Sequence, residues 1–316
     1  MTYTTRMLPT RNGSVRFFRF RGIDVFVHWS WFLVAFYFIY ARHASRVSLA
    51  WNALEYLSLF VIILMHEFGH SFACRQVGGK ADQIILWPLG GVAYVDPPQR
   101  PGATLWSIAA GPLVNVALLP VLTFLYFRSG YWHLPEQLSG LPNFFYDLWV
   151  TNTVILCFNL LPVYPLDGGQ ILRSLLWYFI GRRKSLAVSA IIGTIGVAAL
   201  IVVAYYRSNV WMGVVAIFVL SNCWQGWKES RLLKQMETIP RHEHYTCPSC
   251  KAHPLRAPLW ICGGCQTRFD TFETKGTCPK CFMTFNKTRC PECGAHNLIQ
   301  DWGVIKATPP PPPISV

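Results

Sequence analysis

Six apolar stretches constrain the fold of this 316-residue chain more than any other feature. A membrane-spanning helix needs about 20 consecutive, mostly apolar residues. The stretches lie at residues 25–41, 49–74, 104–127, 145–161, 186–206 and 210–226. Only 14% of the residues are charged, whereas soluble domains carry about 25%. The sequence therefore predicts an all-α polytopic membrane protein with about six transmembrane helices.

The basic residues are distributed unequally between the two sides of these predicted spans. Fifteen Lys and Arg residues fall on the side of the N-terminus, and four (Arg42, Arg46, Arg128 and Arg207) fall on the other. Because positively charged loops stay in the cytoplasm, an even number of spans places both termini there. We expect a multi-pass protein of the cell membrane. This role of the basic residues accounts for most of the net charge of +13, so nucleic acid is an unlikely partner.

The second stretch ends on the motif His66-Glu67-Phe68-Gly69-His70. Residues at i and i+4 lie on one face of a helix, so His66 and His70 can bind the same Zn²⁺. A bound zinc ion lowers the pKa of a water molecule from about 15.7 to about 7, and Glu67 beside it can accept the proton. Ionisable residues inside a membrane span are costly and usually functional. The motif therefore predicts a zinc hydrolase.

A catalytic zinc site generally uses three protein ligands, and Asp167 is the best candidate for the third. Two prolines, Pro162 and Pro165, are expected to end the fourth span. The pair Gly168-Gly169 is expected to let the backbone turn sharply. The Asp167 carboxylate would then lie on an irregular segment that faces a cavity. The alternative is that Asp167 caps a helix in front of the two glycines.

Residues 84–95, between the second and third spans, predict a short membrane-associated β-hairpin. Its β-branched and aromatic residues surround Pro88 and the pair Gly90-Gly91. An open sheet edge cannot face lipid, so the hairpin must be shielded or must line a polar cavity. A free edge beside the metal could pair with an extended substrate strand. The alternative is a connecting turn that only plugs the helix bundle.

Eight of the 11 cysteines form four C-x-x-C pairs near the C-terminus, which predict a double zinc ribbon. The ligands would be Cys247, Cys250, Cys262, Cys265, Cys278, Cys281, Cys290 and Cys293. Sequential pairing places the first four on one structural zinc and the last four on another, and cross-braced pairing stays open. Zinc is needed because about fifty residues with so few apolar side chains cannot fold alone. Reduced, metal-binding cysteines agree with a cytoplasmic C-terminus.

These features divide the chain into five segments. We expect a cytoplasmic N-terminal segment (1–24), a six-span domain that carries the zinc-hydrolase motif (25–226), a linker (227–245), the tandem zinc ribbon (246–300) and a proline-rich disordered tail (301–316).

The motif at residues 66–70, followed by Asn159, Pro162 and Pro165-Leu166-Asp167-Gly168, resembles the site-2 protease family of intramembrane zinc proteases. The segments 88–91 and 111–115 resemble its compact sporulation-type bacterial branch. The similarity covers roughly residues 20–225. It implies peptide-bond hydrolysis in transmembrane segments of membrane proteins, in regulated intramembrane proteolysis. It also implies His66, His70 and Asp167 as ligands of one catalytic zinc, Glu67 as general base, and Asn159 as a group that holds the substrate strand or the oxyanion.

Some residues and segments keep a second interpretation. Asn159 is nearly as well explained by an interhelical hydrogen bond, and we interpret Asn115 and His28 as structural residues. The expected partners are single-span membrane protein substrates, the lipid bilayer, and a protein regulator that binds the zinc ribbons. The alternative function is a non-catalytic membrane adaptor, in which the spans only tether the ribbons.

Overall fold

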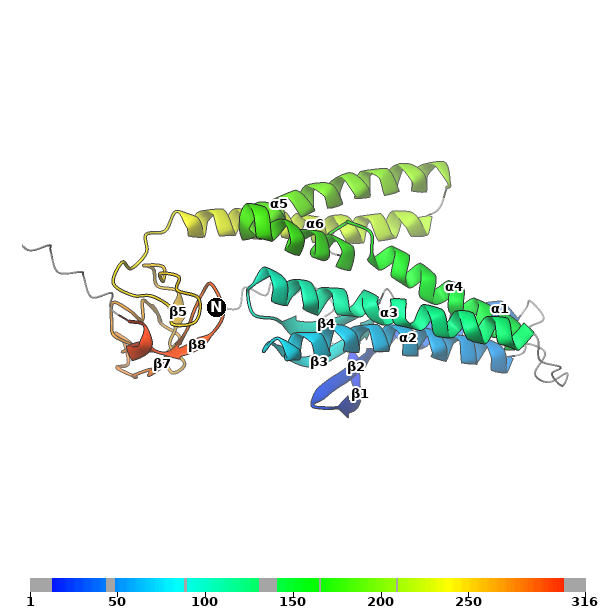
Figure 1. Cartoon of the computed structure of the whole chain (residues 1–316), viewed down its shortest axis with the longest axis horizontal. Coiled ribbons are helices and arrows are strands. Elements are labelled where there is room, and N and C mark those ends of the chain that lie inside the picture. Colours follow the sequence, from blue (N-terminus) through cyan, green and yellow to red (C-terminus); the bar gives the residue numbers. More distant parts are fainter. Residues whose placement is uncertain are drawn as a thin grey trace, which may run out of the picture. The chain divides into compact units, whose positions relative to one another are not determined.

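The computed structural model of the chain describes residues 13–303 except 44–48, 88–89, 131–140, 165 and 209. The chain divides into two compact units, one that ends at Ser230 and one that begins at Arg231 (Figure 1). The first unit contains a four-stranded sheet and the α-helices, the last of which continues past Ser230. The second contains two small hairpins and all four C-x-x-C pairs.

The helices follow the predicted apolar stretches, with corrected ends. They are α1 (Ser30–His43), α2 (Leu49–Gln76), α3 (Pro101–Gly130), α4 (Leu141–Asn159), α5 (Asp167–Tyr206) and α6 (Val210–Glu237). Within the described part of the chain, three of them (α2, α3 and α5) are long and apolar enough to cross a membrane. The 14 residues of α1 extend only about 21 Å at 1.5 Å per residue. The last helix continues past 226 to Glu237, through the first half of the segment expected to be a linker.

The first predicted span was wrong at its start, because residues 25–28 form a strand. Strand β2 (Ile23–His28) pairs antiparallel with β1 (Ser14–Phe20) and parallel with β3 (Lys80–Trp87). The consecutive residues Val25, Phe26 and Val27 favour extended backbone, and all three are buried in the sheet. The helix begins only at Ser30. The N-terminal segment therefore carries two strands that hydropathy alone did not predict.

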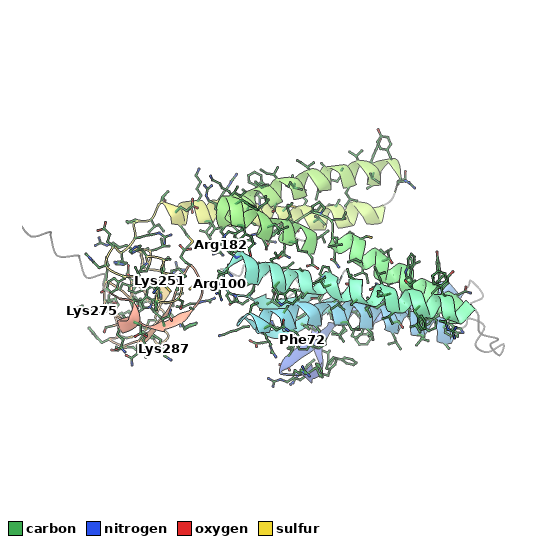
Figure 2. All side chains as sticks on the ribbon, viewed as in Figure 1. Phe72, Arg100, Arg182, Lys251, Lys275 and Lys287 are labelled. Atoms are coloured by element: carbon green, nitrogen blue, oxygen red, sulfur yellow. The ribbon has the colours of Figure 1, made fainter. Side chains whose placement is uncertain are left out.

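The predicted hairpin is confirmed and forms half of a larger sheet with strand order β1-β2-β3-β4. Strands β3 and β4 (Gly90–Asp96) pair antiparallel from Lys80 to Asp96, so the hairpin starts earlier than residue 84. One face of the sheet packs on α2. There the ring of Phe20 on β1 lies 6.4 Å from that of Phe72, which Figure 2 labels. The sheet is thus anchored on the helix that carries His66 and His70, and β4 is one of its two edges.

Arg75 joins the sheet to the last turn of α2. Its Nε donates a hydrogen bond to the carbonyl of Ala81 on β3 (2.9 Å). The two terminal nitrogens donate to the carbonyls of Arg21 (2.5 Å) and Gly22 (3.1 Å). Arg21 and Gly22 both have positive φ, 46° and 77°, as the two-residue turn of a tight hairpin requires. One guanidinium therefore fixes both hairpins of the sheet against the catalytic-motif helix.

The fifth predicted span is only the second part of α5. Gly181 interrupts the 40-residue helix with φ 79° and ψ 167°, a conformation that favours glycine. Figure 1 shows the chain reversing direction there, so α5 is two helices joined at Gly181. Residues 167–180, between the fourth and fifth predicted spans, form a helix that no apolar stretch predicted. This additional helix brings its first residue, Asp167, to the interior of the unit.

The ribbon unit contains two hairpins and four equivalent cysteine turns. Strands β5 (Trp260–Ile261) and β6 (Arg268–Phe269) form one hairpin, and β7 (Lys287–Arg289) and β8 (His296–Leu298) form the other, followed by the short 3₁₀ helix η2 (Ile299–Asp301). In each C-x-x-C turn, the fourth residue after the first cysteine donates its N–H to that cysteine's carbonyl. Those four residues, Lys251, Gln266, Phe282 and Gly294, all have positive φ.

The cysteine pairing differs from the sequential prediction, and it is nested. An outer site gathers Cys247, Cys250, Cys290 and Cys293, and an inner site gathers Cys262, Cys265, Cys278 and Cys281. Neighbouring Sγ atoms lie 3.4–3.8 Å apart, as expected for a tetrahedron with Zn–S bonds of about 2.3 Å. Hydrogen bonding between Cys265 and Thr267 lowers the pKa of Cys265 to about 6, which favours the thiolate that zinc requires.

Aromatic packing explains why the pairing is nested. Cys247 and Cys290 share a buried cluster with Phe272 and Trp302. Cys262 and Cys278 share a second cluster with Phe269. Each cysteine site is therefore built around its own aromatic cluster.

The nested pairing predicts the result of paired substitutions in the full chain. Cys250→Ser with Cys293→Ser removes two thiolates from the outer site, so one zinc ion is lost and the inner one keeps its affinity. Cys265→Ser with Cys278→Ser gives the complementary result. Sequential pairing would leave three thiolates at each site in both variants, and the zinc affinity of both sites would fall equally. Elemental analysis of zinc per chain under a zinc buffer separates these outcomes.

Candidate active site

Three of the predicted site residues converge in the interior of the first unit. His66 Nε2 lies 3.1 Å from His70 Nε2, and Asp167 Oδ2 lies 3.0 Å from the first and 3.3 Å from the second. Both histidines are buried, with 4% and 6% of their surface exposed. Asp167 is 101 residues from His66 in sequence. The described residues therefore contain the predicted ligand triad as one cluster.

Asp167 reaches this cluster as the first residue of α5, which corrects the expected irregular segment. A carboxylate is stabilised at a helix N-terminus by the positive end of the helix dipole. Neither Gly168 nor Gly169 has a positive φ, so the expected sharp turn is wrong as well. The glycines are needed for close packing instead. A Cβ on Gly168 would lie 2.5 Å from the carbonyl oxygen of Leu161, and one on Gly169 would lie 2.7 Å from that of Val163.

The second nitrogen of each imidazole is held by a hydrogen bond. His70 Nδ1 lies 2.9 Å from the carbonyl oxygen of Ser107, which can only accept, so Nδ1 carries the proton. His66 Nδ1 lies 2.6 Å from Asn115 Oδ1. Both Nε2 atoms then present lone pairs to each other and to the Asp167 carboxylate. Three acceptors at about 3 Å repel one another unless a cation lies between them.

The cluster has the dimensions and the donor set of a zinc site. Zinc lies about 2.0–2.1 Å from nitrogen and oxygen ligands, which places the ligand atoms of a tetrahedral site about 3.3 Å apart. The three observed separations are 3.0, 3.1 and 3.3 Å. Two imidazoles and one carboxylate also form the ligand set of many catalytic zinc enzymes, in which the fourth position stays open. The residues therefore fit Zn²⁺.

Gly111 on α3 covers the site from the neighbouring helix. A Cβ at this position would overlap Nε2 and Cε1 of His70 and would lie 2.8 Å from His66 Nε2. Gly69 of α2 is equally close to α3, because a Cβ there would lie 2.7 Å from the carbonyl oxygen of Ala110. The two glycines allow α2 and α3 to approach each other closely beside the imidazoles.

Glu67 lies between the ligand helix and the edge strand β4. Its Oε2 accepts a hydrogen bond from the N–H of Ala93 (2.8 Å). A Cβ on Gly91 would lie 2.6 Å from both Cδ and Oε1 of Glu67, so the strand can approach the carboxylate only because residue 91 is glycine. Glu67 is 6% exposed. The hairpin therefore holds the predicted general base beside the metal ligands.

Comparison with known proteins agrees with this geometry. The sequence profile of peptidase family M50 matches residues 55–140 and 134–203. A zinc metalloprotease of Methanocaldococcus jannaschii is 32% identical over 228 residues, which cover 72% of this chain and 63% of that protein. The solved structure of the site-2 protease from the same organism aligns with a TM-score of 0.50 and 28% identity, over 67% of this chain and 94% of that one. The chain is therefore similar to peptidase family M50 over residues 55–203.

Other relatives of the chain include a putative zinc metalloprotease of Synechocystis, 25% identical over 72% of this chain and 63% of that protein. Stage IV sporulation protein FB of Bacillus subtilis is 34% identical over 37% of this chain and 38% of that protein. The resemblance predicted from the motifs is thus confirmed. The chain spans about 63% of the length of the M. jannaschii and Synechocystis relatives. The cysteine sites follow the residues matched by the M50 profile.

The remaining predicted residues differ in their relation to the ligand triad. Asn159 is the half-buried last residue of α4, and its catalytic role stays a prediction. Asn115, interpreted as structural, contacts the ligand His66 directly. His28 lies on β2, where its ring is 4.7 Å from that of Trp87 and Nδ1 is 2.5 Å from the Ser30 hydroxyl. These contacts agree with its interpretation as a packing residue.

Asn152 was missed by sequence reasoning. It is fully buried on α4 and is hydrogen-bonded to Asn115. The signal was present, because an asparagine inside a stretch apolar enough for the membrane requires a partner there.

Proposed function

We propose that this protein is a zinc-dependent intramembrane endopeptidase that cleaves transmembrane segments of other membrane proteins in regulated intramembrane proteolysis. The observation that carries the proposal is the convergence of His66, His70 and Asp167 with Glu67 beside them on an apolar helix. His66 lies ten residues before the end of α2, which is about 15 Å along the helix. The site would therefore lie below the membrane surface, in a protein with six spans and both termini in the cytoplasm.

The residues of the chain have distinct roles in this reaction. Zinc, when bound by His66, His70 and Asp167, acidifies a water molecule and polarises the carbonyl of the scissile bond. Glu67 accepts the proton of the attacking water and passes it to the leaving amine. The Ala93 N–H holds the Glu67 carboxylate in place before substrate arrives. Asn159 would hold the substrate strand or the oxyanion.

The edge of β4 provides a place for an extended substrate. β4 pairs with β3 on one side, and the Ala93 N–H points away from β3 because it donates to Glu67. An unwound substrate segment could add to this edge by backbone hydrogen bonds. Single-span membrane proteins fit this mode, since an isolated helix has no neighbours to keep it wound. Water would enter from the cytoplasmic side, where α2 ends.

The zinc ribbons are proposed to bind a protein regulator or the substrate. Each Cys₄ zinc centre carries a net charge near −2, since four thiolates surround one Zn²⁺. This charge makes nucleic acid an unfavourable ligand.

Counting zinc in the full-length protein tests the function together with its ligand set. The wild-type chain is expected to hold three zinc ions and Asp167→Ala only two, because two imidazoles alone bind zinc weakly. The same substitution is expected to abolish cleavage of co-expressed single-span membrane proteins, detected by a size shift. Arg173→Lys, on the same helix, is the matched control. Three zinc ions in the Asp167→Ala protein would show that Asp167 is not the third zinc ligand. A wild-type chain with two zinc ions and no cleavage would favour the membrane adaptor.

A further inference from the structure

Two buried asparagines connect the ligand His66 to helices α3 and α4. Asn115 on α3 and Asn152 on α4 are both fully buried. Asn115 Nδ2 donates to Asn152 Oδ1 (2.8 Å), and Asn152 Nδ2 donates to the backbone carbonyl of Asn115 (3.0 Å). Asn115 Oδ1 then lies 2.6 Å from His66 Nδ1.

The direction of these hydrogen bonds follows from one group that can only accept. The Asn115 carbonyl has no proton, so Asn152 must direct its NH₂ toward it and its Oδ1 toward the Asn115 side chain. Asn115 must then direct its own NH₂ toward Asn152 and its Oδ1 toward His66. An oxygen at this position requires the His66 proton on Nδ1, which leaves Nε2 with the lone pair that a metal needs.

We propose that Asn152 is a positioning residue for the catalytic zinc, which acts through Asn115 to fix the tautomer and orientation of His66. The proposal rests on the proposed function, since it assigns a role toward the same metal. Packing of α3 on α4 does not explain the pair, because apolar side chains of similar size would pack equally well. A buried polar network is costly unless each of its polar groups has a hydrogen-bond partner. Here the last partner in the network is His66, a predicted metal ligand.

The first test replaces Asn152 with leucine, which keeps the volume and removes both hydrogen bonds. Asn115 can then rotate its amide and present NH₂ to His66, which opposes the zinc-binding tautomer. We expect the dissociation constant of the third zinc ion to rise 10- to 100-fold, the usual cost of losing a group that orients a metal ligand. The measurement is zinc per full-length chain across buffered free-zinc concentrations. Thr153→Val is the matched control, because its hydroxyl bonds to Trp149 within α4.

A second test separates positioning from a structural role. In an Asn115→Asp background, either carboxylate oxygen accepts the His66 proton, so no orientation by Asn152 is required. The zinc penalty of Asn152→Leu should then largely disappear, which is a strong coupling between the two sites. An equal penalty in both backgrounds, or a wild-type zinc affinity in Asn152→Leu, would overturn the proposal.

The variant His66→Ala shows whether the positioning role of Asn152 alone is wrong or the proposed function is wrong as well. If the wild-type chain holds three zinc ions, His66→Ala two, and Asn152→Leu three with unchanged affinity, the positioning role alone is wrong. If the wild-type chain and His66→Ala both hold two, the proposed function is wrong, and the positioning role with it.

Discussion

Glu67→Gln is expected to lower the rate of peptide-bond cleavage by about 10²- to 10⁴-fold, the usual contribution of a general base, and to leave three zinc ions in the chain. Glutamine keeps the size and can still accept the Ala93 hydrogen bond through its carbonyl oxygen, so the position beside β4 is preserved. It has no basic oxygen to accept a proton from water. The variant should therefore lose cleavage activity and keep the zinc content of the wild-type chain.

The measurement is the cleavage rate of a co-expressed single-span membrane protein, with elemental zinc analysis of the same preparation. Glu55→Gln is the matched control, since it makes the same change on α2, twelve residues before Glu67 and so about 18 Å away along the helix. Cleavage at the wild-type rate by Glu67→Gln would exclude Glu67 as the base. Loss of zinc together with activity would instead indicate that Glu67 supports the metal ligands.

Gly111→Ala is expected to remove the catalytic zinc through a single methyl group. The new Cβ would overlap Nε2 and Cε1 of His70 and would lie 2.8 Å from His66 Nε2. Because the imidazoles are held from behind by Ser107 and Asn115, they cannot move back without losing hydrogen bonds. The helix itself should tolerate the change, since alanine favours helix more than glycine by about 1 kcal/mol.

Zinc content and cleavage are both measured for this variant, and two zinc ions per chain with no cleavage are expected. Gly213→Ala on α6 is the control, because a Cβ there meets no atom within 4 Å. A Gly111→Ala protein that keeps three zinc ions and full activity would show that α3 does not cover the imidazoles as closely as described.

Local patterns predicted the parts of the site that depend on short-range geometry. His66 and His70 face the same way because any helix places i and i+4 on one side, and the structure confirms their pairing. The hairpin at residues 84–95 was predicted for a similar reason, from β-branched residues around a Pro and a Gly pair. Strand β2 was missed because Val25-Phe26-Val27 directly precede an apolar helix, and hydropathy does not separate a buried strand from a span.

Long-range contacts explain the other differences between the sequence-based predictions and the structure. Asp167 was selected as a ligand by its type and setting, yet its place at the start of a helix depends on close packing of Gly168 and Gly169 against the preceding turn. The cysteine spacing predicted two zinc sites, whereas the nested pairing follows from aromatic clusters that join distant turns. Asn115 and Asn152 were recognisable only as polar residues in apolar helices until the structure placed them behind His66.

The sequence by itself determined the apolar helices, the metal-binding face of α2 and the number of cysteine turns, because each depends on the repeat of one helix or one turn. Only the tertiary structure decided that Asp167 lies at the start of a helix, which cysteine turns share a site, and what holds His66 in its tautomer. Those choices are made by side-chain packing between segments up to a hundred residues apart, and the residue spacing along the chain places no limit on such contacts.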